Sequence, residues 1–116
     1  MAPSTANSFN LRSILEKDKL NGTNFIDWYR NLRIVLKQEK KEYVLEQDYP
    51  DEPAASTSAA DKRAYEKHCN DDLDVSCLML ATMNSELQKQ YEDTPAHNMI
   101  EGLKGMFQGQ SRAERS

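Results

Sequence analysis

Apolar residues recur at intervals of three and four along most of the chain. This spacing places them on one face of an α-helix. The strict apolar–polar alternation typical of half-buried β-strands does not persist anywhere in the sequence. The pattern therefore predicts an all-α fold, a small bundle of about five helices.

The clearest of these helices is predicted to begin after Asn24, whose short polar side chain suits the N-cap position. One face of it carries Phe25, Trp28, Tyr29, Leu32, Val35 and Leu36. A fully buried side chain of this size contributes roughly 1.5–3 kcal/mol to folding. The face led by Trp28 is therefore predicted to anchor the core.

A long helix is predicted from residue 61 to about residue 83. Its inner face is expected to consist of Tyr65, Cys69, Leu73, Cys77 and Leu80. The acidic residues Asp71, Asp72 and Asp74 occupy nearby helical positions that point in different directions. A water-exposed acidic face is expected here, rather than a carboxylate pair for acid–base chemistry.

Shorter elements complete the predicted bundle. An amphipathic segment carries Phe9, Leu11, Ile14 and Leu15, residues 43–45 form one apolar turn, and residues 86–91 form a short connecting helix. The last helix begins at Thr94 and Pro95, a favourable N-cap and first helical residue. Its buried face is predicted to contain Ala96, Met99, Ile100, Leu103 and Phe107.

These elements predict one helical domain over residues 9–110. A disordered tail at 1–8, a flexible acidic loop at 48–60 and a frayed tail at 111–116 are expected around and within it. The predicted core consists of Phe25, Trp28, Leu32, Leu36, Leu73, Leu80, Ile100 and Leu103.

Length and composition narrow the class of protein. A chain of 116 residues is enough for one small domain. No stretch approaches the roughly 20 apolar residues of a membrane-spanning helix. The first five residues lack the apolar centre of a signal peptide. Two cysteines are too few for a disulfide-rich secreted protein, so a cytoplasmic location is expected. Neither a membrane nor a small-molecule partner is expected.

Charge argues against nucleic-acid binding as the main task. The net charge is −4, whereas a dedicated nucleic-acid domain is usually strongly basic. The first 47 residues carry eight Lys and Arg against six Asp and Glu, and the remainder carries seven against thirteen. Any basic surface is therefore expected in the first part of the chain.

That part contains one candidate basic patch. Lys37, Lys40 and Lys41 follow Arg30 and Arg33 near the end of the first long helix. A water-exposed helix end is the favoured interpretation, because cations suit the negative end of the helix dipole. Weak contact with RNA phosphates through these five residues is the alternative.

No cofactor, metal or catalytic residue is predicted. Cys69 and Cys77 are eight residues apart on one predicted helix, about 12 Å along its axis, which is too far for a disulfide. With His68 and His97 they show no metal-ligand spacing. The common hydrolase, phosphate-binding and dinucleotide-binding motifs do not occur, so an enzyme is not expected.

Residues 20–28 carry a more specific signal. They read Leu-Asn-Gly-Thr-Asn-Phe-Ile-Asp-Trp, with a predicted turn at Asn21 and Gly22, and are followed by Leu32 and Leu36. The segment resembles the start of Gag polypeptides of copia-type LTR retrotransposons, which show Leu-x-Gly-x-Asn-Tyr/Phe-x-x-Trp before amphipathic leucines. Looser similarity extends the resemblance over about residues 9–110.

The resemblance implies a capsid-like amino-terminal fold and self-association into a cytoplasmic virus-like particle around the element's RNA. Two departures stand out. The family often has Trp three residues before a Leu of the last helix, where this chain has Ile100 before Leu103. Its Gag proteins also continue into further helices and an RNA-binding zinc knuckle that this sequence lacks. A truncated copy, a fragment retained by a host or an expressed fragment would each fit.

Two other functions stay open at this stage. A helical adaptor would bind a host protein through an exposed apolar groove. Weak RNA binding would use the basic patch described above. Homo-oligomerisation is the partner expectation that the resemblance implies.

Overall fold

The structure is a computed structural model that describes the backbone of residues 11–115 and the side chains of residues 11–107. Within this part the chain forms six helices and no strand, which confirms the predicted all-α class. The helices are α2 (Arg12–Lys17), α3 (Phe25–Glu39), α4 (Tyr43–Glu46), α5 (Ala59–Ala81), α6 (Ser85–Gln90) and α7 (Ala96–Arg115). The predicted tail at residues 1–8 lies outside the described residues, as do the side chains of the predicted tail at 111–116.

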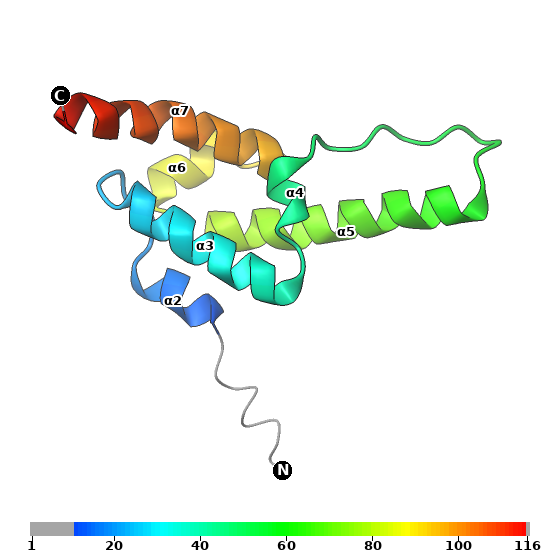
Figure 1. The fold of residues 1–116 in the computed structure, drawn as a ribbon, viewed down its shortest axis with the longest axis horizontal. Helices are drawn as coiled ribbons and strands as arrows, with labels where there is room; N and C mark the ends of the chain where they lie inside the picture. Colours follow the sequence, from blue (N-terminus) through cyan, green and yellow to red (C-terminus); the bar gives the residue numbers. More distant parts are fainter. Residues whose placement is uncertain (1–10, 116) are drawn as a thin grey trace, which may run out of the picture.

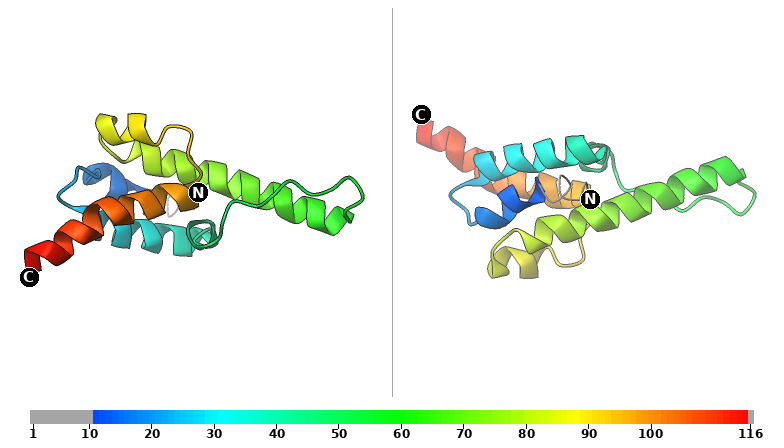
Figure 2. Two further views of the ribbon diagram at one scale, coloured as in Figure 1. Left: turned by 90° about the horizontal axis from the view of Figure 1, so that it is seen from above. Right: turned by 90° about the horizontal axis from the view of Figure 1, so that it is seen from below.

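The helices surround one core (Figure 1). In both views of Figure 2, α3 runs along one side of the bundle, and α6 with the end of α5 runs along the other. The first half of α5 extends beyond the bundle, and the chain between α4 and α5 runs back along it. This arrangement leaves the outer sides of α3 and α5 on different sides of the molecule.

Most of the predicted core residues lie where the spacing indicated. Trp28 is 1% exposed, and Leu32, Leu36, Ile100 and Leu103 are fully buried. Phe25 is also buried, and Leu80 is partly buried against the same cluster. The apolar faces of α3 and α7 therefore form the core as expected.

The predicted inner face of α5 is wrong at Leu73 and Cys77. Leu73 is 64% exposed, and Cys77 is exposed as well. The side of α5 that enters the core carries His68, Asp71, Asp72, Val75, Ser76, Leu78 and Met79. Asp71 and Asp72 of this face have hydrogen-bond partners on other elements, and His68 packs against the ring of Tyr43. A polar side chain therefore did not mark the outer side of this helix.

The Leu20–Trp28 segment connects the two halves of the chain. Leu20 is fully buried, its N–H donates to the Thr82 carbonyl at 2.8 Å, and its carbonyl accepts from the Asn84 N–H at 2.9 Å. Asn24 does not cap α3 with its side chain, contrary to the prediction. Its Oδ1 accepts from the Asn21 N–H, and its Nδ2 donates to the Lys19 carbonyl, so the side chain closes the turn instead.

The ends of the long helices follow local chemistry. Ser58 caps α5 by accepting from the Asp61 N–H at 3.1 Å, so the helix begins at Ala59, two residues before the predicted start. Helix α3 ends at Glu39, and Lys40 follows it in the left-handed conformation with a φ of 64°. The Lys41 N–H then donates back to the Leu36 carbonyl at 2.8 Å, a pattern typical of helix C-termini.

Candidate interaction surface on helix α3

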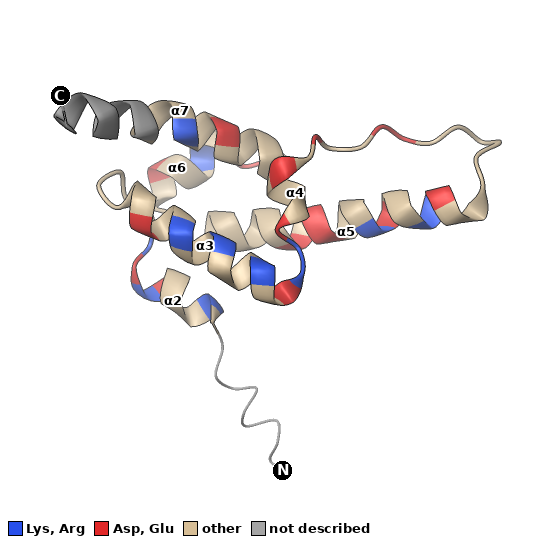
Figure 3. Cartoon of the chain, viewed as in Figure 1, with Lys and Arg blue, Asp and Glu red and all other residues tan. Residues whose placement is uncertain are grey.

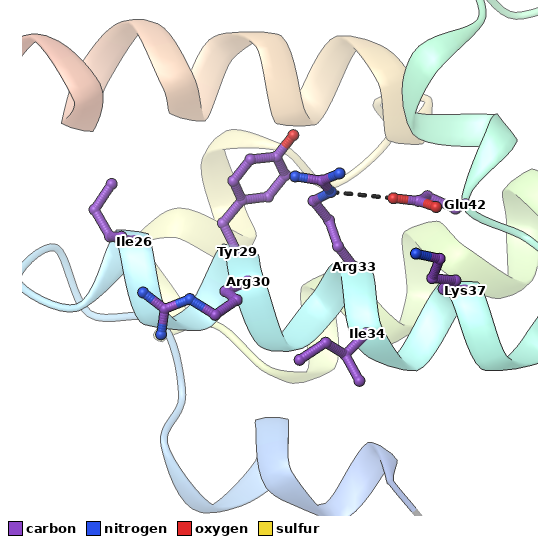
Figure 4. A pocket seen from close by; sticks show the side chains of 7 residues that line it. All are labelled: Ile26, Tyr29, Arg30, Arg33, Ile34, Lys37 and Glu42. Atoms are coloured by element: carbon purple, nitrogen blue, oxygen red, sulfur yellow. Dashed lines mark hydrogen bonds and ion pairs between the residues drawn. The ribbon is translucent and has the colours of Figure 1, made fainter.

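The outer side of α3 forms a shallow hollow of about 360 Å³ (Figure 4). We call this the α3 surface and define it by Ile26, Tyr29, Arg30, Arg33, Ile34, Lys37 and Glu42. All but Glu42 come from α3, at spacings of three and four residues. Helical spacing turns Ile26, Ile34 and the cations away from the Trp28 face. Tyr29, which the spacing assigned to that face, lies partly buried against the core and also lines the hollow.

Two exposed isoleucines give the α3 surface its apolar character. Ile26 is 44% exposed and Ile34 is 46% exposed. Both belong to the small set of large apolar side chains that the described part of the chain leaves in water. Tyr29 lies between them along the helix and is held in place by stacking on Phe25, with ring centroids 5.5 Å apart. The surface therefore presents apolar groups on a firmly packed helix.

Cations recur along α3, where Figure 3 marks their positions in blue, and Figure 4 shows them on the same surface as the isoleucines. Arg30 pairs with Asp27 at 3.0 Å, and Arg33 pairs with Glu42 at 3.0 Å. The hydrogen bond to Glu42 raises the pKa of Arg33 above its usual value. Lys37 has no ion-pair partner among the described residues, and it leaves a positive charge available at this surface.

Tyr29 also holds cations from two helices. The Arg33 guanidinium lies 5.7 Å from the centroid of the Tyr29 ring, and Lys104 Nζ of α7 lies 5.3 Å from it. Such contacts contribute roughly 0.5–1 kcal/mol at exposed sites. The tyrosine therefore orders the cationic edge of the surface next to α7.

The structure divides the five predicted RNA contacts into two groups. Arg30, Arg33 and Lys37 lie together on the α3 surface. Lys40 and Lys41 do not line it, because the helix ends at Glu39 and the chain turns away. Lys41 Nζ instead lies 2.5 Å from Asp74 Oδ2 of α5. Of the five cations of the alternative RNA-binding interpretation, only Arg30, Arg33 and Lys37 therefore belong to the α3 surface.

The predicted water-exposed acidic face on α5 is also wrong. Asp71 and Asp72 are buried. Asp71 accepts hydrogen bonds from the Tyr43 hydroxyl and from Lys67 Nζ. Burial alone would raise the pKa of Asp71, but Lys67 and Tyr43 outweigh it and hold that pKa below its usual value.

Asp74 and Asp72 join other elements to α5. Asp74 accepts from Lys41 and, at 2.8 Å, from Arg12, and these two cations lower its pKa despite partial burial. Arg12 also reaches Glu39 at 2.5 Å, which ties α2 to the end of α3. Asp72 Oδ1 accepts from the Ala96 N–H at 2.9 Å, at the start of α7. The three acids therefore have structural partners that the sequence alone did not reveal.

The cysteines and histidines have separate roles. Cys69 and Cys77 are free thiols. The Tyr49 hydroxyl donates to Cys69 Sγ at 3.1 Å, and this hydrogen bond together with burial raises the pKa of Tyr49 to about 12. His68 packs edge-on against Tyr43, whereas His97 Nδ1 lies 2.6 Å from the Leu45 carbonyl. Among residues 11–107 no three metal-binding side chains gather in one place.

A second surface lies on α5 beside the segment that joins α6 to α7. We call it the α5 surface and define it by Tyr49, Cys69, Leu73, Cys77, Leu80, Glu92, Asp93 and Pro95, which line a hollow of about 300 Å³. Leu73 is its most exposed apolar side chain. Sequence reasoning missed this surface because it placed Leu73 in the core.

Comparison with known proteins gives no family. No family model, curated protein or solved structure matches the chain. Among the helices of residues 11–115, none combines the length and apolar character that crossing a membrane requires.

Proposed function

We propose that the chain is a structural, non-enzymatic protein of the cytoplasm that self-associates in the manner of a retrotransposon Gag capsid. The observation that carries this proposal is the two-sided character of α3. One side buries Phe25 and Trp28, the part of the Gag-like motif that lies in α3, and the other side exposes the isoleucines of the α3 surface.

The motif residues have structural roles on the inner side. Leu20 joins the backbone at Thr82 and Asn84, Asn24 closes the turn before α3, and Trp28 fills the centre of the core. Structural roles for the motif residues support a protein that acts as a rigid building block.

The outer side supplies a surface for repeated contacts. Burying a whole Ile side chain contributes roughly 1.5–3 kcal/mol. Ile26 and Ile34 are about half exposed, so covering both would contribute on the order of 2 kcal/mol by the same relation. A contact of this strength is weak alone, and it becomes effective when many copies repeat it in an assembly.

The test is the mass of the 116-residue chain in solution as a function of concentration. Sedimentation velocity and light scattering are expected to show oligomers that grow with concentration, and electron microscopy is expected to show regular assemblies. Ile34→Glu should raise the protein concentration at which oligomers form by at least tenfold. Gln38→Glu places the same charge on an exposed position of α3 outside the surface and should leave the growth unchanged.

Other results would overturn the proposal. A chain that stays monomeric at every concentration and salt condition would exclude self-assembly by this protein. Salt-sensitive binding to RNA that Ile34→Glu leaves intact would instead assign the surface to phosphate contact by Arg30, Arg33 and Lys37.

A further inference from the structure

We propose that self-association joins two unlike surfaces, with the α3 surface of one copy against the α5 surface of the next. This inference rests on the proposed function and names the contact that the assembly would use. The partner it commits to is a second copy of the same chain.

Charge is the first reason for pairing these two surfaces. Arg30, Arg33 and Lys37 border the α3 surface. Glu92 and Asp93 border the α5 surface, and neither carboxylate has an ion-pair partner within the described part of the chain. Opposite charges facing each other across a contact fix its orientation and disfavour the like-charged arrangement. Pairing two α3 surfaces would bring the cations together.

Shape and apolar character give the second reason. Leu73 projects from α5 with 64% of its surface in water, more than any other large apolar side chain of the described residues. The α3 surface is a hollow with exposed isoleucines at Ile26 and Ile34. Both surfaces are shallow hollows that expose apolar side chains, so Leu73 of one copy can cover Ile26 and Ile34 of the next.

The placement of the surfaces determines what such a contact builds. Helices α3 and α5 present them on different sides of the bundle (Figure 2), so one copy can bind two neighbours at the same time. A contact between unlike surfaces continues from copy to copy as a ring or an open row, whereas a contact between like surfaces stops at a dimer. The inferred contact therefore permits the extended growth that a shell requires.

The experiment uses two variants of the full chain, each with one surface blocked. Ile34→Glu blocks the α3 surface and keeps the α5 surface, and Leu73→Glu does the reverse. Each variant alone is expected to stay at the monomer mass of 13.3 kDa in sedimentation velocity. At concentrations at which the unmodified chain assembles, an equimolar mixture is expected to shift toward a species of twice that mass. It should not grow further, because its two remaining surfaces are both blocked.

Two control variants carry the same new charge elsewhere. Gln38→Glu on α3 and Ala64→Glu on α5 change exposed residues that line neither surface. Both should assemble as the unmodified chain does. Circular dichroism and urea unfolding should show that all four variants keep the fold, because all four changed side chains are exposed to water.

The possible results separate the two proposals. If Leu73→Glu alone still dimerises, the contact joins two α3 surfaces, and the inferred pairing is overturned while self-association stands. A mixture that remains monomeric, beside an unmodified chain that assembles, also overturns the pairing alone. An unmodified chain that never assembles overturns the proposed function, and this inference with it.

Discussion

The indole N–H of Trp28 donates a hydrogen bond to the hydroxyl oxygen of Thr82, with 3.3 Å between the two atoms. Thr82 is fully buried, and its hydroxyl donates in turn to the Leu78 carbonyl at 2.8 Å. The bond links the start of α3 to the end of α5, which are 54 residues apart in the sequence. A single buried hydroxyl therefore satisfies the polar atom of the largest side chain in the core.

Thr82→Val should destabilise the fold by about 1–3 kcal/mol, because it leaves the Trp28 N–H buried without an acceptor. Urea unfolding followed by the fluorescence of Trp28, the single tryptophan of the chain, would measure this. Thr82→Ser keeps the hydroxyl and should lose less stability than the valine variant. Equal stability of the valine variant and the unmodified chain would show that the bond contributes nothing.

Asp72→Ala should destabilise the start of α7. It removes the acceptor of the Ala96 N–H and of the Ser76 hydroxyl, and a lost buried acceptor costs about 1–3 kcal/mol. Asp72→Asn keeps a carbonyl oxygen and should cost less. Hydrogen exchange of the first α7 amides should accelerate in the alanine variant. Asp51→Ala, at an exposed position between α4 and α5, is the control and should not change that exchange.

Two glycines of α7 should respond to alanine in opposite ways. At Gly105 an added Cβ meets no atom within 4 Å, so Gly105→Ala should stabilise the helix by about 0.5–1 kcal/mol. At Gly102 the added Cβ would lie 2.6 Å from the Tyr91 hydroxyl oxygen and 3.1 Å from its ring. Tyr91 is buried, so Gly102→Ala should lower the thermal unfolding midpoint. A higher midpoint for Gly102→Ala would contradict this packing.

Acid should weaken the contacts of α5. The pKa of Asp74 is lowered by Lys41 and Arg12, and that of Asp71 is lowered by Lys67 and Tyr43 against the effect of burial. The ordinary value is 3.8, so these carboxylates stabilise the fold above about that pH. The stability is lost as the pH falls through the lower values of the folded state. Urea midpoints measured from pH 7 to pH 3 should therefore fall.

Asp74→Asn provides the matched variant for the acid experiment. It should lose about 1 kcal/mol at pH 7, a modest amount because Asp74 is partly exposed to water. Its stability should then depend less on pH than that of the unmodified chain. An identical pH profile for both proteins would exclude Asp74 as a source of the acid sensitivity.

Helices α3 and α7 could be predicted from the sequence because their apolar residues alone decide which side is buried. Trp28 and Leu32 on α3, like Ile100 and Leu103 on α7, repeat at helical spacing and lie in the core. In these helices the burial of apolar area determines which side faces the core, and the spacing of apolar residues within the helix itself reveals that side.

Helix α5 could not be predicted in the same way. Its buried side contains Asp71 and Asp72, and their partners Tyr43 and Ala96 are 28 and 24 residues away. Spacing therefore assigned Leu73 to the core and the acids to water, the reverse of the observed arrangement. Only the tertiary contacts decide the orientation of such a helix.

The candidate surfaces were predictable in part. Arg30, Arg33 and Lys37 stood out as cations on one helical face, but Lys41 has a distant partner in Asp74 that redirects it. The apolar part of the α3 surface was visible in the sequence as Ile26 and Ile34, two apolar residues on the otherwise polar face of the helix.

Helix α5 spans 23 residues, or about 34 Å, yet its first buried residue is His68. The turns before His68 rest on helix propensity and the Ser58 cap, whereas the turns after it are locked by the core. Backbone amides of this one continuous helix should therefore exchange with solvent on two separate timescales, fast in the projecting turns and only upon global unfolding near Met79. A protease would find its first cleavage sites in that projecting arm.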